Sequence, residues 1–339
     1  MTDILLKLDK LKTHFHTERG MVTAVDGITF EVGKGEIVGL VGESGCGKSV
    51  TIQSILRLLD ERSVVYEGEV NYKEKNLLNC NKREMQQIRG NEVSMIFQDP
   101  LSSLNPVQTI GRQISEPIMI HQKVSKKVAK EEAVNLLRLV GIPNPEARIN
   151  EYPHQLSGGM RQRAMIAVAL ACKPSLLLAD EPTTALDVTI QSQILKLMKD
   201  LNEDLHMGII FITHDLGVVA ELCSRVIVMY LGEVVEEASV QELFTRPLHP
   251  YTQGLIQSIP KIDGDRSEEL HVIKGTVPSL SQVPEGCRFA NRCLYASTKC
   301  FDAPPPTYTE TNSQKVKCWR YKEIQEMKEV APHEIENAK

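Results

Sequence analysis

A glycine-rich stretch at residues 42–49, with the sequence GESGCGKS, constrains the fold of this chain more than any other feature. It matches the pattern G-x-x-x-x-G-K-[ST] of a phosphate-binding P-loop. An apolar run at residues 37–41 precedes it, and a plausible helix over residues 51–59 follows it. Because a P-loop joins a strand to the start of a helix, this context predicts a nucleotide-binding α/β unit.

The composition of the P-loop has a physical reason. Glycines allow backbone N–H groups to point at phosphate oxygens, and a helix N-terminus adds partial positive charge. Lys48 is expected to reach the β- and γ-phosphates, and Ser49 is expected to hold Mg²⁺. The residues predicted to contact the nucleotide here are Gly42, Ser44, Gly45, Cys46, Gly47, Lys48, Ser49 and Val50.

Composition narrows the class of protein. A length of 339 residues is enough for two domains. The net charge of −5 gives no reason to expect nucleic-acid binding. No apolar run approaches the 18 residues that indicate a membrane span, and the first 12 residues lack the apolar core of a signal peptide. We therefore expect a cytosolic protein with reduced thiols.

Hydrophobic patterns along the chain predict an α/β fold. Short apolar runs at residues 93–97, 175–179, 209–213 and 225–230 indicate buried strands, and helical periodicity lies between several of them. Such alternation predicts a mostly parallel central sheet. Helical periodicity also extends over residues 110–140. Beyond Ser258 the chain becomes rich in proline, cysteine and polar residues, which predicts a small loop-rich appendage with a charged, partly disordered end.

Two further motifs point to a specific class of ATPase. Residues 156–160, LSGGM, resemble the signature sequence of ATP-binding-cassette (ABC) ATPases, and residues 176–181, LLLADE, resemble their Walker B strand. Ser157, Gly158 and Gly159 would offer a hydroxyl and backbone N–H groups to an anion at a helix start. Of the two acids, Asp180 would order Mg²⁺, and Glu181 would act as general base toward the attacking water.

Smaller motifs occur where the ABC family has them. Gln98 resembles the Q-loop glutamine, which implies contact with the metal and the attacking water. His214 resembles the switch histidine, which implies contact with the γ-phosphate. Residues 184–187 resemble the D-loop, although Thr184 stands where the family usually has serine, and the resemblance makes Asp187 a link between opposed subunits. Phe15 is the candidate for stacking on adenine, where the family usually has tyrosine.

The resemblance implies a domain organisation and a dimer. Residues 1–258 would form an ABC nucleotide-binding domain of the P-loop NTPase fold, with a helical subdomain at about 99–165. Residues 259–339 would form the cysteine-containing C-terminal part. In this family ATP lies between the P-loop of one cassette and the signature of another, so a second ATPase subunit, identical or paralogous, is implied.

Two segments narrow the resemblance to one subfamily. Residues 99–106, DPLSSLNP, and residues 246–252, RPLHPYT, look like those of oligopeptide/dipeptide importers. The resemblance implies an ATP-hydrolysing subunit at the cytoplasmic face of the membrane. Its partners would be integral-membrane permease subunits and, indirectly, an extracytoplasmic substrate-binding protein. A related nickel, glutathione or other solute importer, or a soluble ABC ATPase, remains the alternative.

The last four cysteines suggest a metal site. Cys287, Cys293, Cys300 and Cys318 have the spacing C-x5-C-x6-C-x17-C, which resembles the tail of peptide-importer ATPases. Four thiols in a small cytosolic segment suggest a metal that holds it together. A [4Fe–4S] cluster is favoured, and the alternatives are Zn²⁺, unligated thiols or a disulfide. Since this tail supplies no nucleotide motif, we expect replacement of any one of these cysteines to leave the P-loop able to bind ATP.

Overall fold

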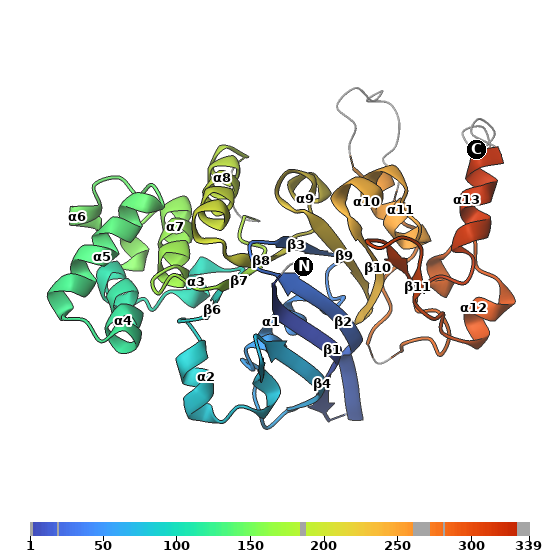
Figure 1. The fold of residues 1–339 in the computed structure, drawn as a ribbon, viewed down its shortest axis with the longest axis horizontal. Coiled ribbons are helices and arrows are strands. Elements are labelled where there is room, and N and C mark those ends of the chain that lie inside the picture. The colour runs from blue at the N-terminus through green and yellow to red at the C-terminus, as the bar shows by residue number, and fades with distance from the viewer. Residues whose placement is uncertain (1–2, 19, 184–187, 260–271, 281, 331–339) are drawn as a thin grey trace.

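The computed structural model describes residues 3–18, 20–183, 188–259, 272–280 and 282–330. An eight-stranded sheet lies at its centre (Figure 1), with the strand order β11-β12-β10-β9-β3-β8-β7-β6. The strands from β9 to β6 run parallel to one another, which confirms the predicted α/β fold. Their bounds are β3 Ile37–Val41, β6 Val93–Ile96, β7 Leu176–Asp180, β8 Gly208–Ile212 and β9 Arg225–Tyr230.

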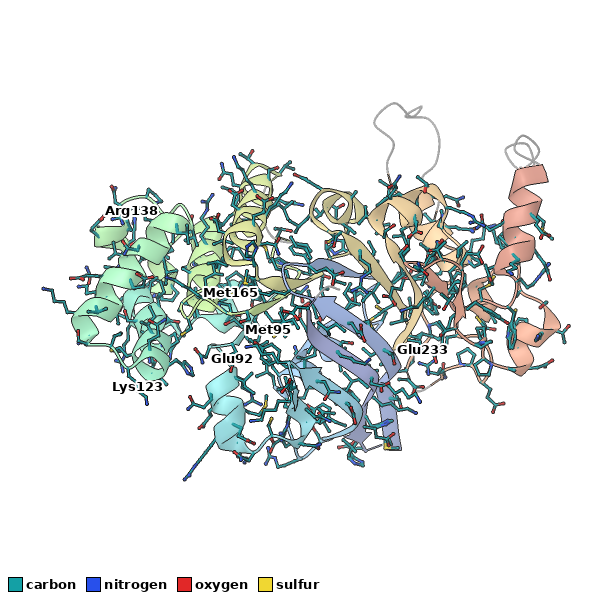
Figure 2. All side chains as sticks on the ribbon, in the orientation of Figure 1. Glu92, Met95, Lys123, Arg138, Met165 and Glu233 are labelled. Atoms are coloured by element: carbon teal, nitrogen blue, oxygen red, sulfur yellow. The ribbon has the colours of Figure 1, made fainter. Side chains whose placement is uncertain are left out.

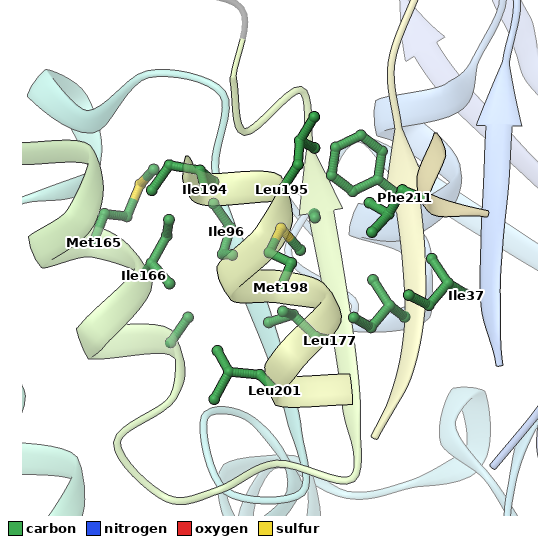
Figure 3. Close-up of a cluster of buried hydrophobic side chains, with 14 of the residues drawn as sticks. Ile37, Ile96, Met165, Ile166, Leu177, Ile194, Leu195, Met198, Leu201 and Phe211 are labelled. Atoms are coloured by element: carbon green, nitrogen blue, oxygen red, sulfur yellow. The ribbon is translucent and has the colours of Figure 1, made fainter. Parts of the chain in front are cut away.

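The central strands are apolar because both faces of the sheet are covered. Every residue of β3, β7 and β8 is buried, as expected for a parallel sheet between two layers. Alternate residues of β3 enter opposite clusters: Ile37 and Val41 face one, and Val38 and Leu40 face the other. Figure 3 shows the first cluster, where Met198 and other side chains of α8 (Val188–Leu205) lie against Leu177 of β7.

A second, antiparallel sheet covers the other face. It has the strand order β2-β1-β4-β5. Its apolar side chains share a cluster with those of helix α1 and with Val38 and Leu40 of β3. The bounds are β1 Ile4–Thr17, β2 Gly20–Gly33, α1 Lys48–Ile55, β4 Val64–Tyr72 and β5 Lys75–Asn76, followed by the 3-10 helix η1 Leu77–Asn79 and α2 Lys82–Ile88.

Helices between β6 and β7 form a layer at one end of the molecule (Figure 1). The predicted helical stretch over residues 110–140 consists of two helices, because Lys123 adopts a left-handed conformation and Ser125 caps the next helix. Figure 2 labels Lys123 at this turn. The bounds are α3 Pro100–Ser103, α4 Ile110–Gln122, α5 Lys126–Leu139, α6 Pro145–Arg148, η2 Pro153–Gln155 and α7 Gly158–Ala169.

The C-terminal segment joins the central sheet. Strand β12 pairs with β10, with Val316 opposite Glu236, so the described tail extends the sheet. Glu233 of β10, labelled in Figure 2, pairs with both Arg288 and Lys317. The charged end expected to be disordered begins with a helix, α13. The bounds are α9 Leu216–Leu222, β10 Glu233–Ser239, α10 Val240–Thr245, α11 Pro250–Gln257, η3 Ala290–Arg292, α12 Thr298–Asp302, β11 Tyr308–Thr309, β12 Lys315–Val316 and α13 Tyr321–Val330.

Among the residues that the structure describes, no helix is both long enough and apolar enough to cross a membrane.

Candidate active site

The glycine-rich loop connects β3 to α1, as the sequence predicts. Two of its glycines are required by space and by backbone conformation. Gly42 has a φ of +150°, and a Cβ there would lie 2.2 Å from the carbonyl oxygen of Met229. Gly47 has a φ of +104°, and its Cβ would lie 2.6 Å from the carbonyl oxygen of Ala24. Larger residues at these two positions would displace the loop from the sheet.

The side chain of Lys48 folds back against the P-loop. Its side chain is buried, and its Nζ donates to the carbonyl oxygens of Gly42, at 2.8 Å, and Glu43, at 3.0 Å. An ammonium group carries three hydrogen-bond donors. Phosphate oxygens can therefore replace these carbonyls as acceptors, and the charged group keeps its hydrogen bonds. Contact of this ammonium group with phosphate stays a prediction.

The other predicted loop contacts occupy different environments. Ser44 and Gly45 are exposed at the crown of the loop. Cys46 is buried, and burial raises the pKa of its thiol. Val50 packs on the cluster beneath α1. These contacts with nucleotide stay predictions.

Ser49 and Asp180 meet at the end of the loop. The Ser49 hydroxyl donates to Asp180 Oδ1 at 2.9 Å. Asp180 is buried at the end of β7, and this burial raises the pKa of its carboxyl. A hydroxyl and a carboxylate oxygen are the hard ligands that Mg²⁺ prefers, so the pair fits the metal predicted from the sequence.

Three side chains converge beside this pair from the carboxyl ends of adjacent strands. Gln98 Nε2 donates to Glu181 Oε2 at 3.1 Å, and His214 Nδ1 lies 3.5 Å from the same oxygen. Because β6, β7 and β8 are parallel neighbours, the residues that follow them meet at one edge of the sheet. The predicted catalytic group is therefore assembled around one carboxylate.

The backbone at Glu181 is held in an uncommon conformation. Its φ is +44°, in the left-handed region that non-glycine residues seldom adopt. The N–H of Glu181 donates to the carbonyl of Ile212 at 3.1 Å, which ties this turn to β8. Such local strain is typical of functional sites.

The signature residues lie at the start of α7. Ser157 caps this helix by accepting from the N–H of Met160 at 3.3 Å, and both Ser157 and Gly158 are exposed. A Cβ on Gly158 would meet nothing within 4 Å, whereas one on Gly159 would lie 3.6 Å from Ile190. The helix start is therefore open at the surface, and its contact with an anion stays a prediction.

Gln162 is a residue that the sequence analysis missed. It lies one turn into α7, is 3% exposed, and donates through Nε2 to the carbonyl of Pro182. It thus connects the signature helix to the residue after Glu181. The available signal was a polar residue among the apolar positions of a helix, which is weak because buried glutamines also serve packing.

Two predicted residues are not placed in this group. Asp187 lies outside the described residues. Phe15 is half-buried in β1, opposite Val22 of β2 and Val64 of β4. Adenine stacking on Phe15 stays a prediction.

The four C-terminal cysteines are gathered in one place. Cys287, Cys293, Cys300 and Cys318 line one cavity with aromatic side chains that include Phe289 and Trp319. Burial raises the pKa of Cys293 to about 11 and that of Cys318 to about 12. Within the described residues, no group of three or more His, Cys, Asp or Glu side chains is arranged to hold a metal ion.

The C-terminal tail also contacts the P-loop, which the sequence did not predict. Arg292, in the same segment as the cysteines, forms an ion pair with Glu43 inside the P-loop, with 2.6 Å between Nη1 and Oε2. The two residues are 249 positions apart, so no local pattern could have predicted their contact.

Comparisons with known proteins match both parts of the chain. Residues 25–184 match the family described as ABC transporter, and residues 235–300 match the oligopeptide/dipeptide transporter C-terminal region. The "Probable peptide ABC transporter ATP-binding protein y4tR" of Sinorhizobium fredii is 53% identical, over 95% of this chain and 96% of its own. The "Oligopeptide transport ATP-binding protein AppD" of Bacillus subtilis is 52% identical, over 94% and 97% respectively.

Solved structures share the cassette fold. The ATP-binding cassette MJ0796, described as a dimer in a post-hydrolysis state bound to ADP and Pi, aligns with a TM-score of 0.63 and 29% identity. The alignment covers 69% of this chain and 98% of that one. The cassette cbiO1 of Clostridium perfringens, described as part of an ABC transporter complex, aligns with a TM-score of 0.60 and 27% identity, over 72% of this chain and 92% of that one.

Proposed function

The chain belongs to the family of peptide ABC transporter ATP-binding proteins, and from that premise we propose that it hydrolyses ATP to drive the import of di- or oligopeptides. The observation that carries the enzymatic part is the convergence of Gln98 and His214 on Glu181, beside the Ser49–Asp180 pair. The similarity of about half of all residues to peptide transport proteins, along nearly the whole chain, supports the substrate class.

Each residue of the site has a separate role in phosphoryl transfer, in which catalysis consists mostly of positioning and charge stabilisation. Lys48 and the loop N–H groups bind the phosphates. Ser49 and Asp180 hold Mg²⁺, which neutralises phosphate charge when bound. Glu181 takes the proton from the attacking water. Gln98 orients that carboxylate, and His214 donates a hydrogen bond to the γ-phosphate.

Hydrolysis on this scheme requires two cassettes. The exposed signature, with its capping Ser157 and open Gly158, covers the γ-phosphate held by an opposed subunit. The dimeric state described for the MJ0796 cassette supports this arrangement. The second subunit is either a copy of this chain or a paralogue, and Asp187 would lie between the two.

A membrane partner is supported by the loop after Gln98. Phe97, Leu101 and Val107 expose 39%, 64% and 79% of their surface, although all three are apolar. Exposed apolar side chains within one short stretch of the chain favour a protein interface there. Because Gln98 bonds to Glu181, a permease docked here would be connected directly to the catalytic carboxylate. We place the chain at the cytoplasmic face of the membrane, bound to permease subunits that receive peptide from an extracytoplasmic binding protein.

We expect the double variant Leu101→Glu/Val107→Glu to lose peptide transport and still bind ATP, because the two charges disrupt the apolar surface without reaching the P-loop. The measurement is peptide uptake by the reconstituted complex, with ATP binding to the isolated chain as the second readout. Val65→Glu is the matched control, since Val65 is an exposed apolar side chain of the antiparallel sheet. Normal uptake by the double variant would exclude this docking surface.

For the cysteine-bearing part, we propose that the four thiolates hold a [4Fe–4S] cluster, with Zn²⁺ as the alternative. Their position around one cavity supports a shared group. A tetrahedral zinc site needs thiolates within roughly 4 Å of one another, since Zn–S bonds are about 2.3 Å. A four-iron cube accepts a wider spacing of its four thiolates than a single zinc ion does. When bound, such a group would join Cys287 to Cys318 across the tail.

We expect anaerobically purified protein to contain about four irons per chain, the content of a Cys₄-ligated [4Fe–4S] cluster. Cys318→Ser removes one ligand and should lose the iron, while Cys172→Ser, a half-buried cysteine elsewhere, should keep it. One zinc per chain would support the alternative. Metal-free wild-type protein with an ordered tail would refute both metals.

A further inference from the structure

The P-loop is held from outside by two side chains that belong to none of its motifs. Tyr251 of α11 accepts, through its hydroxyl oxygen, the N–H of Glu43 at 2.7 Å. Arg292, at the end of η3, donates from Nη1 to Glu43 Oε2 at 2.6 Å and from Nη2 to Oε1 at 2.9 Å. One loop residue is therefore held by its backbone and by its carboxylate.

The arginine itself has little freedom. Its side chain is 4% exposed. Nε donates to the carbonyl of Lys274 at 3.1 Å, and Nη1 also lies 3.4 Å from the hydroxyl of Tyr230. A two-pronged arginine–carboxylate contact fixes the plane of both groups, so the carboxylate of Glu43 is held in one orientation.

Packing braces the same region. Tyr230, Tyr251 and Phe289 form a cluster of three rings, with centroids 4.8, 5.2 and 5.3 Å apart. Tyr230 and Tyr251 are fully buried. Because Phe289 belongs to the segment that carries Arg292, these contacts fix that segment against the end of β9, beside the loop.

The contact leads directly to the phosphate-binding lysine. Lys48 Nζ donates to the backbone carbonyl of Glu43, the residue whose carboxylate Arg292 holds. A shift of Glu43 would move an oxygen that helps to place the ammonium group. A P-loop that is already ordered also avoids part of the entropy that ligand binding otherwise costs.

We propose that Arg292 is a positioning residue for the ATPase: by holding Glu43, it keeps the P-loop in the conformation that accepts phosphate. The C-terminal segment is thereby part of the nucleotide site. This inference rests on the ATP binding in the proposed function and is independent of the solute transported.

The test measures MgATP affinity of the full-length chain by calorimetry, in the Glu181→Gln background so that turnover does not interfere. Arg292→Ala should weaken MgATP binding by about 10-fold or more, the range expected for losing a hydrogen bond to a charged group. Glu43→Gln should weaken it in the same direction. The double variant should be no weaker than the worse single variant, since both break one contact.

Two further variants separate positioning from general stability. Arg292→Lys, which keeps the charge but not the fork, should recover part of the affinity. Arg246→Ala is the matched control: Arg246 pairs with Glu310 at 3.3 Å in the same half of the chain, and its loss should leave MgATP affinity unchanged. If Arg292→Ala does not fold, Glu43→Gln answers the question, because it exchanges one oxygen for nitrogen on a partly exposed side chain.

In the assembled complex with Glu181 intact, Arg292→Ala and Glu43→Gln should raise the KM for ATP and leave kcat nearly unchanged, which indicates lost binding rather than lost chemistry. Wild-type affinity and KM in Arg292→Ala or Glu43→Gln, even with a lower melting temperature, would overturn the inference. Failure of the parent chain to bind MgATP would instead refute the proposed function.

Discussion

Glu181→Gln is expected to lower the rate of ATP hydrolysis by about 10²- to 10⁴-fold, the usual contribution of a general base. The amide has the shape of the carboxylate but cannot accept a proton from water. Gln98 and His214 both approach Glu181 Oε2, at 3.1 and 3.5 Å, so this carboxylate lies at the centre of the candidate catalytic group. MgATP binding should persist because Lys48, Ser49 and Asp180 are unchanged.

Single-turnover hydrolysis by the assembled complex checks this prediction, and light scattering with MgATP should detect a dimer that no longer dissociates. Glu146→Gln is the matched control, since Glu146 is an exposed carboxylate paired with Arg138 on the helical layer. Hydrolysis at the wild-type rate by Glu181→Gln would remove Glu181 from the role of base.

Gly158→Asp is expected to reduce hydrolysis by about 10²- to 10³-fold, the loss typical when a phosphate-stabilising contact is removed. A Cβ at Gly158 meets no atom within 4 Å in its own chain, so the variant should fold normally. In a head-to-tail dimer, however, the new carboxylate faces the γ-phosphate held by the opposed subunit. Like charges then repel where the helix start should attract an anion.

The readouts are hydrolysis by the complex and MgATP binding to the isolated chain. MgATP binding to the isolated chain should be unchanged, because Gly158 lies in α7 and not in the P-loop that binds the nucleotide in the same chain. Lys126→Asp, which places an acid at the exposed start of α5, is the control for charge at a helix N-terminus. If Gly158→Asp hydrolyses ATP normally, the signature does not cover a nucleotide.

The members of the candidate catalytic group could be named from the sequence because they occur where the ABC family has its motifs, each after a short buried strand. Gln98, Glu181 and His214 come after apolar runs, and parallel neighbouring strands bring such residues to one edge. The glycines of the P-loop could also be predicted to have a structural role, since Gly42 and Gly47 occupy positions that no larger side chain could take.

Contacts between distant segments could not be predicted in the same way. Arg292 and Gln162 carry no motif, and their partners are set by tertiary packing. The joining of β12 to β10 depends on a strand of two residues, too short to give a periodic signal. The break at Lys123 was hidden because both flanking helices share one apolar periodicity. Phe15 and Asp187 remain predictions.

The most direct test of the central claim is uptake of a labelled tripeptide into proteoliposomes that contain this chain, its permease subunits and the binding protein. We predict that the tripeptide accumulates only when MgATP is supplied on the side of the membrane that carries the ATPase. Accumulation should stop with Glu181→Gln. Unlabelled peptides should compete, whereas nickel and glutathione should not. ATP-driven uptake of nickel or glutathione in place of peptide, or ATP hydrolysis that no peptide stimulates, would contradict the account.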